Sequence, residues 1–121
     1  MGETNWLPEL DALVAAPAHH RLLLENDRVR VLDTEIGPGD RTPLHTHRWP
    51  AVLYVLSWSD FVRRDADGIV LVDTRGREPV SGALWSPPLG PHTLENVGAA
   101  PIRVISVEVK SRAGPSATIA T

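Results

Sequence analysis

The chain has 121 residues, of which 42% are hydrophobic and 22% are charged, and it carries a net charge of -3 and no cysteine. This length and composition predict one globular domain with its own core, and the lack of cysteine excludes disulfides and thiolate metal ligands. The weak negative charge gives no reason to expect nucleic acid or an anionic membrane as a partner.

The N-terminal residues 1–20 predict an arm that contains one short helix. They show no signal-peptide pattern, and no apolar run in the chain approaches the ~20 residues of a membrane-spanning helix, so we expect a cytoplasmic protein. Residues 8–16 begin with a proline and carry an apolar stripe at helical spacing, which favours a helix. His19 and His20 follow. Adjacent residues of a strand point to opposite faces, so we expect a solvated pair and not joint metal ligands.

Residues 21–110 predict an all-β domain, because short strand patterns follow one another and are separated by Gly, Pro, Asn and Asp. The expected strands cover residues 21–25, 29–36, 42–47, 51–58, 60–64, 69–73 and 101–110. Residues 51–58 are nearly all apolar, as in a strand that is covered on both faces. Residues 84–91 contain three prolines and indicate a turn leading into His92. Residues 111–121 predict a small, polar C-terminal tail, disordered or held by a partner.

Two histidines of the expected strand 42–47 indicate a metal site. His45 and His47 are two residues apart, so both side chains project from one face of the strand. Imidazole is the commonest side-chain ligand for borderline transition metals, and His92 is a third candidate. A His-X-His pair by itself is more often an ordinary surface pair, so the interpretation depends on the sequence around it.

That surrounding sequence resembles the two signatures of the cupins. The first is a glycine, five residues and the histidine pair (Gly39, His45, His47), and the second is a glycine, five residues, Pro-X-Gly, a histidine and an asparagine (Gly82, Pro88, Gly90, His92, Asn96). The resemblance implies an all-β jelly-roll (double-stranded β-helix) barrel with a short N-terminal helix. It also implies that His45, His47 and His92 bind one divalent transition metal and that Asn96 is structural.

The chain departs from the cupin pattern at the usual fourth metal ligand. The family has a glutamate three or four residues after the second histidine, where this chain has Ala51 and Val52. Trp58 replaces a later glycine, and the spacing between Gly90 and His92 is one residue short. If Ala51 occupies the glutamate position, three neutral imidazoles leave the metal with its full charge and about three open coordination positions.

Resemblance to cupins with three-histidine sites implies a dioxygenase or a related oxidoreductase or lyase. Fe(II) is the first choice of metal, with Mn, Ni, Zn, Co or Cu as alternatives, and the substrate is expected to be a small organic anion that chelates the metal. No protein nucleophile is expected to take part. The alternatives are a non-catalytic cupin that binds a small molecule or metal, as a sensor or store, and a structural barrel with vestigial histidines.

Five residues are candidates for the substrate pocket. Trp49 and Trp85 lie close to the histidines in sequence and either form an apolar wall or fill the core, and Ala51 is expected beside the metal. Arg30 and Arg103 lie on expected strands and could bind a carboxylate, although arginine is more often a surface residue.

The partner that we expect besides a small molecule is a second copy of the chain. Residues 22–24 are three leucines that precede the main barrel strands. An open sheet edge needs cover, and an apolar edge segment can add to the sheet of a neighbour. The sequence therefore predicts a homodimer.

Overall fold

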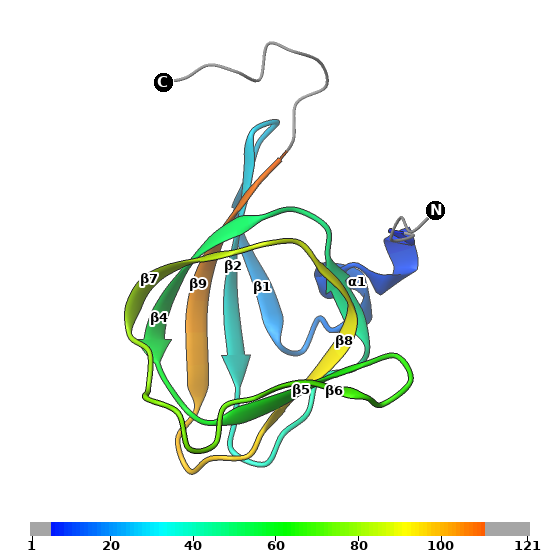
Figure 1. Ribbon diagram of the computed structural model, residues 1–121. Helices are drawn as coiled ribbons and strands as arrows, with labels where there is room; N and C mark the ends of the chain where they lie inside the picture. The colour runs from blue at the N-terminus through cyan, green and yellow to red at the C-terminus, as the bar shows by residue number, and fades with distance from the viewer. Residues whose placement is uncertain (1–5, 111–121) are drawn as a thin grey trace.

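The computed structural model describes residues 6–110, which form two antiparallel sheets that wrap around a common interior (Figure 1). One sheet has the strand order β1-β2-β9-β4-β7 and the other has the order β3-β8-β5-β6. The elements are η1 (Pro8–Leu10), α1 (Ala12–Ala15), β1 (His20–Glu25), β2 (Val29–Ile36), β3 (His45–His47), β4 (Ala51–Ser57), β5 (Phe61–Asp65), β6 (Val70–Asp73), β7 (Gly82–Ser86), β8 (Leu89–Asn96) and β9 (Ile102–Val109). The predicted all-β jelly-roll with a short N-terminal helix is confirmed. The expected tail, residues 111–121, lies outside the described residues.

The N-terminal helix is shorter than the sequence predicts, because Asp11 interrupts it. Asp11 has an extended ψ of 143° and its carboxylate accepts a hydrogen bond from the backbone N–H of Leu13 at 3.1 Å, so it caps α1 after the 3-10 turn η1. Ala12 is fully buried where α1 packs against β1 and β3. No helix among residues 6–110 is long and apolar enough to cross a membrane.

Strand β4 is covered on one face only, which corrects the expectation for residues 51–58. Ala51 is buried, whereas Val52, Tyr54 and Leu56 are 40%, 52% and 50% exposed. The described chain places no element over the outer face of this sheet, so its alternate side chains remain at the surface. Burial within one copy of the chain therefore does not account for the apolar side chains on the outer face of β4.

The segment around His92 is a strand and not the predicted turn. His92 lies within β8, which pairs with β3 so that His45 and His92 are opposite each other. The register between β3 and β8 shifts between the His45–His92 pair and the His47–Leu89 pair, which leaves Pro91 at an irregular position of the ladder. A proline is tolerated there because no regular ladder hydrogen bond needs its missing N–H.

The register of the five-stranded sheet brings three positions of the site into one row. Arg30 of β2 is opposite Glu108 of β9, and Glu108 is in turn opposite Ala51 of β4.

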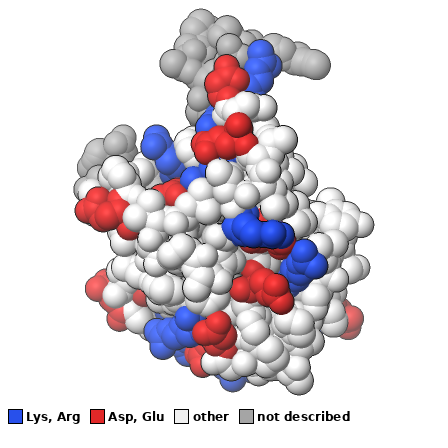
Figure 2. Space-filling view, turned by 180° about the vertical axis from the view of Figure 1, so that it is seen from behind, with Lys and Arg blue, Asp and Glu red and all other residues white. Residues whose placement is uncertain are grey.

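On the face seen in Figure 2, basic and acidic side chains lie next to each other, and no broad area of that face carries a single sign of charge.

Candidate metal centre

Four histidines from three strands form a cluster inside the barrel. His20 begins β1, His45 and His47 lie on β3, and His92 lies on β8. The ring centroids of His45 are 4.8 Å from His20, 5.1 Å from His47 and 4.4 Å from His92. One ring nitrogen each from His20, His45 and His47 lie within 4.8 Å of one another, so these three residues could hold a metal ion.

The Nδ1 atom of every ring in this cluster faces a hydrogen-bond acceptor. The acceptors are Ala16 O for His20 (3.0 Å), Pro43 O for His45 (2.8 Å), Glu108 Oε2 for His47 (3.0 Å) and Gly90 O for His92 (2.7 Å). A carbonyl oxygen can only accept, so Nδ1 carries the hydrogen and Nε2 of the neutral ring keeps its lone pair. This is the arrangement that orients histidine ligands of metals.

Burial keeps three of the rings neutral at physiological pH. Burial is the main cause that lowers the pKa of His20 to about 4, of His45 to about 2 and of His92 to about 3, and the charges of neighbouring histidines lower each pKa further. A metal ligand must be unprotonated, so these three rings need no proton loss at neutral pH before they can bind a cation.

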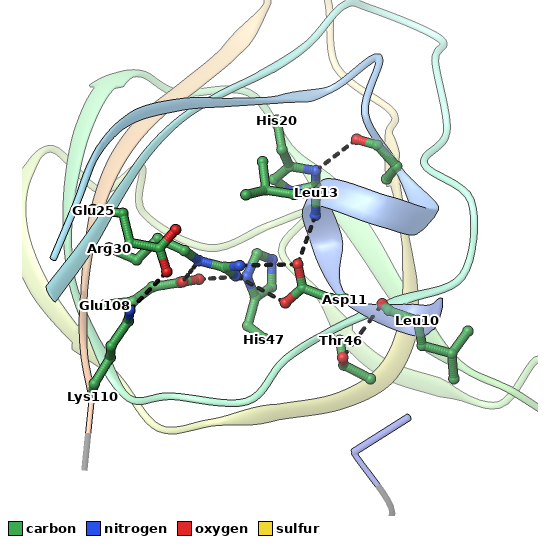
Figure 3. A network of polar contacts seen from close by, with 11 residues as sticks. Leu10, Asp11, Leu13, His20, Glu25, Arg30, Thr46, His47, Glu108 and Lys110 are labelled. Atoms are coloured by element: carbon green, nitrogen blue, oxygen red, sulfur yellow. Dashed lines mark hydrogen bonds and ion pairs between the residues drawn. The ribbon is translucent and has the colours of Figure 1, made fainter. Parts of the chain in front are cut away.

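A buried carboxylate is bonded to one ring of the cluster, that of His47 (Figure 3). Glu108 is 1% exposed, and its carboxylate accepts hydrogen bonds from Nδ1 of His47 and, at 2.6 Å, from Nε of Arg30. Arg30 also donates to both carboxylate oxygens of Asp11, at 3.0 and 2.9 Å. Burial by itself raises the pKa of Glu108, but the hydrogen bonds from His47 and Arg30 outweigh it and hold the pKa below its usual value. Glu108 is therefore an anion that fixes the His47 ring.

A cavity of about 110 Å³ opens beside the four histidines. Its wall also includes Trp49, Ala51, Arg63 and Ser106, together with apolar side chains from both sheets. Small-molecule sites are typically concave and mostly apolar, with a few polar groups that converge on the ligand. The cluster thus faces a space that a small ligand can enter.

The rings of His45, His47 and His92 lie next to one another, but the three residues whose nitrogens are close enough to hold a metal are His20, His45 and His47. The sequence analysis placed His20 in a solvated pair. His19 and His20 do point to opposite sides. The ring of His19 makes a 2.8 Å hydrogen bond to Asp40, whereas that of His20 is buried in the cluster. The expectation of a solvated pair was wrong because the start of β1 lies over the cavity, and this placement depends on the fold of the whole barrel.

Three of the five pocket candidates lie outside the cavity. Trp49 and Ala51 line the cavity. Trp85 is 59% exposed on β7. Arg103 does not line the cavity and forms an ion pair of 2.9 Å with Asp33. Arg30 is buried but bonded to Glu108 and Asp11, so it is not free to bind a substrate carboxylate.

The donor set fits a divalent transition metal. Neutral imidazoles with a fixed tautomer suit Fe, Ni, Cu and Zn, and a buried carboxylate behind one ring raises the basicity of that ligand. His20, Glu108 and Arg63 were not found by sequence reasoning. The polar residues at alternate positions of residues 104–108 were the available signal for Glu108.

No family model matches the sequence, and no curated protein matches it either. Among solved structures, the chain is similar to a cupin domain from Bordetella pertussis Tohama I, with 18% identity and a TM-score of 0.60 over 76% of this chain and 92% of that one. It is also similar to a protein with a double-stranded β-helix domain from Klebsiella pneumoniae MGH 78578, with 22% identity and a TM-score of 0.54 over 78% of each chain. A third similar structure is the polyketide cyclase RemF from Streptomyces resistomycificus, with 25% identity and a TM-score of 0.51 over 93% of this chain and 76% of that one. The protein therefore has the cupin fold, a double-stranded β-helix.

Proposed function

We propose that this protein is a metal-dependent enzyme that acts on a small organic anion. The observation that carries this proposal is the cluster of His20, His45, His47 and His92, in which every Nδ1 faces an acceptor and the rings line a cavity. His20, His45 and His47, whose ligand nitrogens lie within 4.8 Å of one another, would hold one divalent transition metal, with His92 beside His45 as the fourth ligand. When bound, the metal would supply Lewis-acid polarisation of a substrate oxygen.

The residues around the cluster have separate tasks in this proposal. Glu108 holds the Nδ1 proton of His47, and Arg30 holds Glu108 in place, so the ring keeps one orientation. Trp49 lines the cavity and, with the apolar side chains around it, limits the access of water. The guanidinium of Arg30 and the ammonium of Lys110 lie 5.0 and 5.3 Å from the Trp49 ring, which favours one position of that ring.

The fourth histidine changes the balance between reaction classes. A three-histidine site on an octahedral ion leaves room for a chelating substrate and O₂ together, but four histidines leave only two positions. A substrate that chelates through two oxygens would fill both. This favours a redox-neutral reaction, such as an isomerisation, lyase reaction or cyclisation, over a dioxygenase. The similarity to the polyketide cyclase RemF supports the same choice.

The test of this proposal combines metal analysis with two assays of turnover. Protein purified without chelators should contain about one transition metal ion per chain by inductively coupled plasma mass spectrometry. A panel of small oxo acids and β-diketones should then include a compound that is consumed without O₂ uptake. Consumption coupled to O₂ uptake would favour a dioxygenase, and metal binding without turnover of any compound would favour a non-catalytic binding protein. Protein without metal would contradict the proposal.

The assembly that we propose is a homodimer in which β1 lies at the contact. β1 is an edge strand of the five-stranded sheet, and Leu22, Leu23 and Leu24 are each exposed. An apolar edge strand invites pairing with another chain. Addition of the same strand from a second copy would cover these leucines symmetrically.

A further inference from the structure

Arg63 is a half-buried cation on the wall of the histidine cavity. It lies on β5 and lines the cavity, and its Nε is buried without a hydrogen-bond partner among residues 6–110. No carboxylate in that part of the chain forms an ion pair with it, and burial alone accounts for the lowered pKa of Arg63. The contrast is Arg103, whose pKa is raised by its hydrogen bond and ion pair with Asp33.

A second unpaired polar atom belongs to the same cavity. The hydroxyl of Ser106, on β9, is buried without a partner among residues 6–110 and lines the cavity. Buried polar groups in proteins nearly always have partners, so two unpaired groups at one cavity indicate that a ligand completes them. Arg63, Ser106 and the four histidines line the same cavity. The charge of Arg63 also contributes to the lowered pKa of His92, after the larger effects of burial and of His47. A ligand in this cavity can therefore lie between Arg63 and the histidine cluster.

We propose that Arg63 and Ser106 bind the carboxylate of a small oxo acid whose carbonyl oxygen faces the histidine cluster, an assignment that rests on the proposed function and names its substrate class. The guanidinium offers two parallel N–H donors that match a carboxylate, and the hydroxyl offers a further donor. The cavity of about 110 Å³ is smaller than the ~150 Å³ cavity that accommodates benzene. The buried part of the substrate therefore has only a few heavy atoms.

The test compares 2-oxobutanoate with its methyl ester, which has the same carbonyl group but no negative charge. Binding of each compound to the metal-loaded protein is measured by calorimetry. Arg63→Met should weaken binding of the oxo acid by about 30-fold or more and leave binding of the ester within about twofold, because only the acid carries a charge that pairs with the guanidinium. Ser106→Ala should weaken binding of the oxo acid by about tenfold. Arg64→Met is the matched control, since Arg64 is adjacent but already paired with Glu95 at 2.9 Å.

Two further measurements separate this assignment from the proposed function and from a structural role. Metal content reports the proposed function, and it should be the same in wild type and Arg63→Met. The thermal shift of metal-free protein with the oxo acid reports the anion subsite alone. Arg63→Met should leave the melting temperature of the ligand-free protein within a few degrees of wild type, because the half-buried guanidinium lies 5.6 Å from the Phe61 ring and forms no ion pair within residues 6–110. Undiminished binding of the oxo acid by Arg63→Met would overturn the assignment even if the metal is bound.

Discussion

The metal-free protein should lose stability steeply below neutral pH, because three histidines of the cluster are buried as neutral rings. Burial chiefly lowers the pKa of His20 to about 4, of His45 to about 2 and of His92 to about 3. In the unfolded chain each ring has an ordinary pKa of about 6.5. The unfolded chain therefore takes up protons first as the pH falls. The stability is fully present above about pH 6.5 and is lost through the window from there towards the folded-state pKa values.

The size of this effect follows from the number of protons that differ between the two states. Near pH ~5 the unfolded chain holds about three more protons than the folded protein, one for each of these rings. Each proton corresponds to roughly 1.4 kcal/mol per pH unit, so the free energy of unfolding should fall by about 4 kcal/mol per unit. A small domain has about 5–15 kcal/mol in total. We therefore expect the metal-free protein to unfold before about pH 4.

The assay is urea denaturation of chelator-treated protein at a series of pH values from 8 to 5, with the m-value checked for constancy. The free energy of unfolding should be level above pH ~7 and steep near pH ~5. His92→Gln should reduce the slope by about 1.4 kcal/mol per pH unit, because one titrating ring is removed. A wild-type slope that corresponds to one proton or fewer would show that the rings are accessible to protons in the folded protein, and the reasoning from burial would fail.

Three other predictions test the cluster and the assembly. His20→Ala should lower metal occupancy as much as His45→Ala. His19→Ala removes a ring that is bonded to Asp40 and should leave metal occupancy unchanged. An equal loss of metal from His19→Ala would contradict the assignment of His20 as a ligand. Glu108→Gln should weaken metal binding by about 10–100-fold in competition with a chromophoric chelator, because the support of His47 is reduced, and unchanged affinity would make that contact incidental. Sedimentation at about tens of micromolar should show a dimer that Leu23→Lys dissociates, and a wild-type monomer would contradict the proposed contact.

Local patterns predicted the strands well where alternation or turn residues were present. The expected strand over residues 29–36 coincides with β2, because its alternating side chains match one buried and one outer face. The failure at residues 51–58 has a physical reason. Tyr54 and its apolar neighbours on the outer face look like core residues in sequence, and only the three-dimensional structure shows that no described element covers them.

The site was predictable only as far as its local motif. His45 and His47 share a face by the geometry of any strand, but His20 enters the cluster through the pairing of β1 with β2 across the sheet. Arg63 could not be identified either. An arginine on a strand is usually a surface residue, and a missing partner is visible only in three dimensions.

The position that carries glutamate in the cupin pattern illustrates how the sheet register changes a prediction. Ala51 lines the cavity whereas Val52 is 40% exposed, so Ala51 is the better candidate for that position, and Glu108 lies opposite it on β9. Directly opposed residues of neighbouring strands have Cβ atoms roughly 5 Å apart. Glu108 approaches the cluster through Nδ1 of His47, so its carboxylate supports one ligand and does not replace the missing one.

Ala51→Glu would therefore place a second carboxylate beside a buried one. At about 5 Å and an effective dielectric constant of about 20, the repulsion is roughly 3 kcal/mol, so the metal-free protein should lose stability by about this amount in urea denaturation. A bound divalent cation would neutralise the pair, so metal should raise the melting temperature more in this variant than in wild type, while turnover should fall because a position for the substrate is taken. Ala51→Gln has a similar shape without the charge and should show a smaller loss of stability and no tighter metal binding. If Ala51→Glu were as stable as wild type without metal and bound metal no more tightly, the new carboxylate would lie away from both Glu108 and the histidines, and position 51 would not be part of the metal centre.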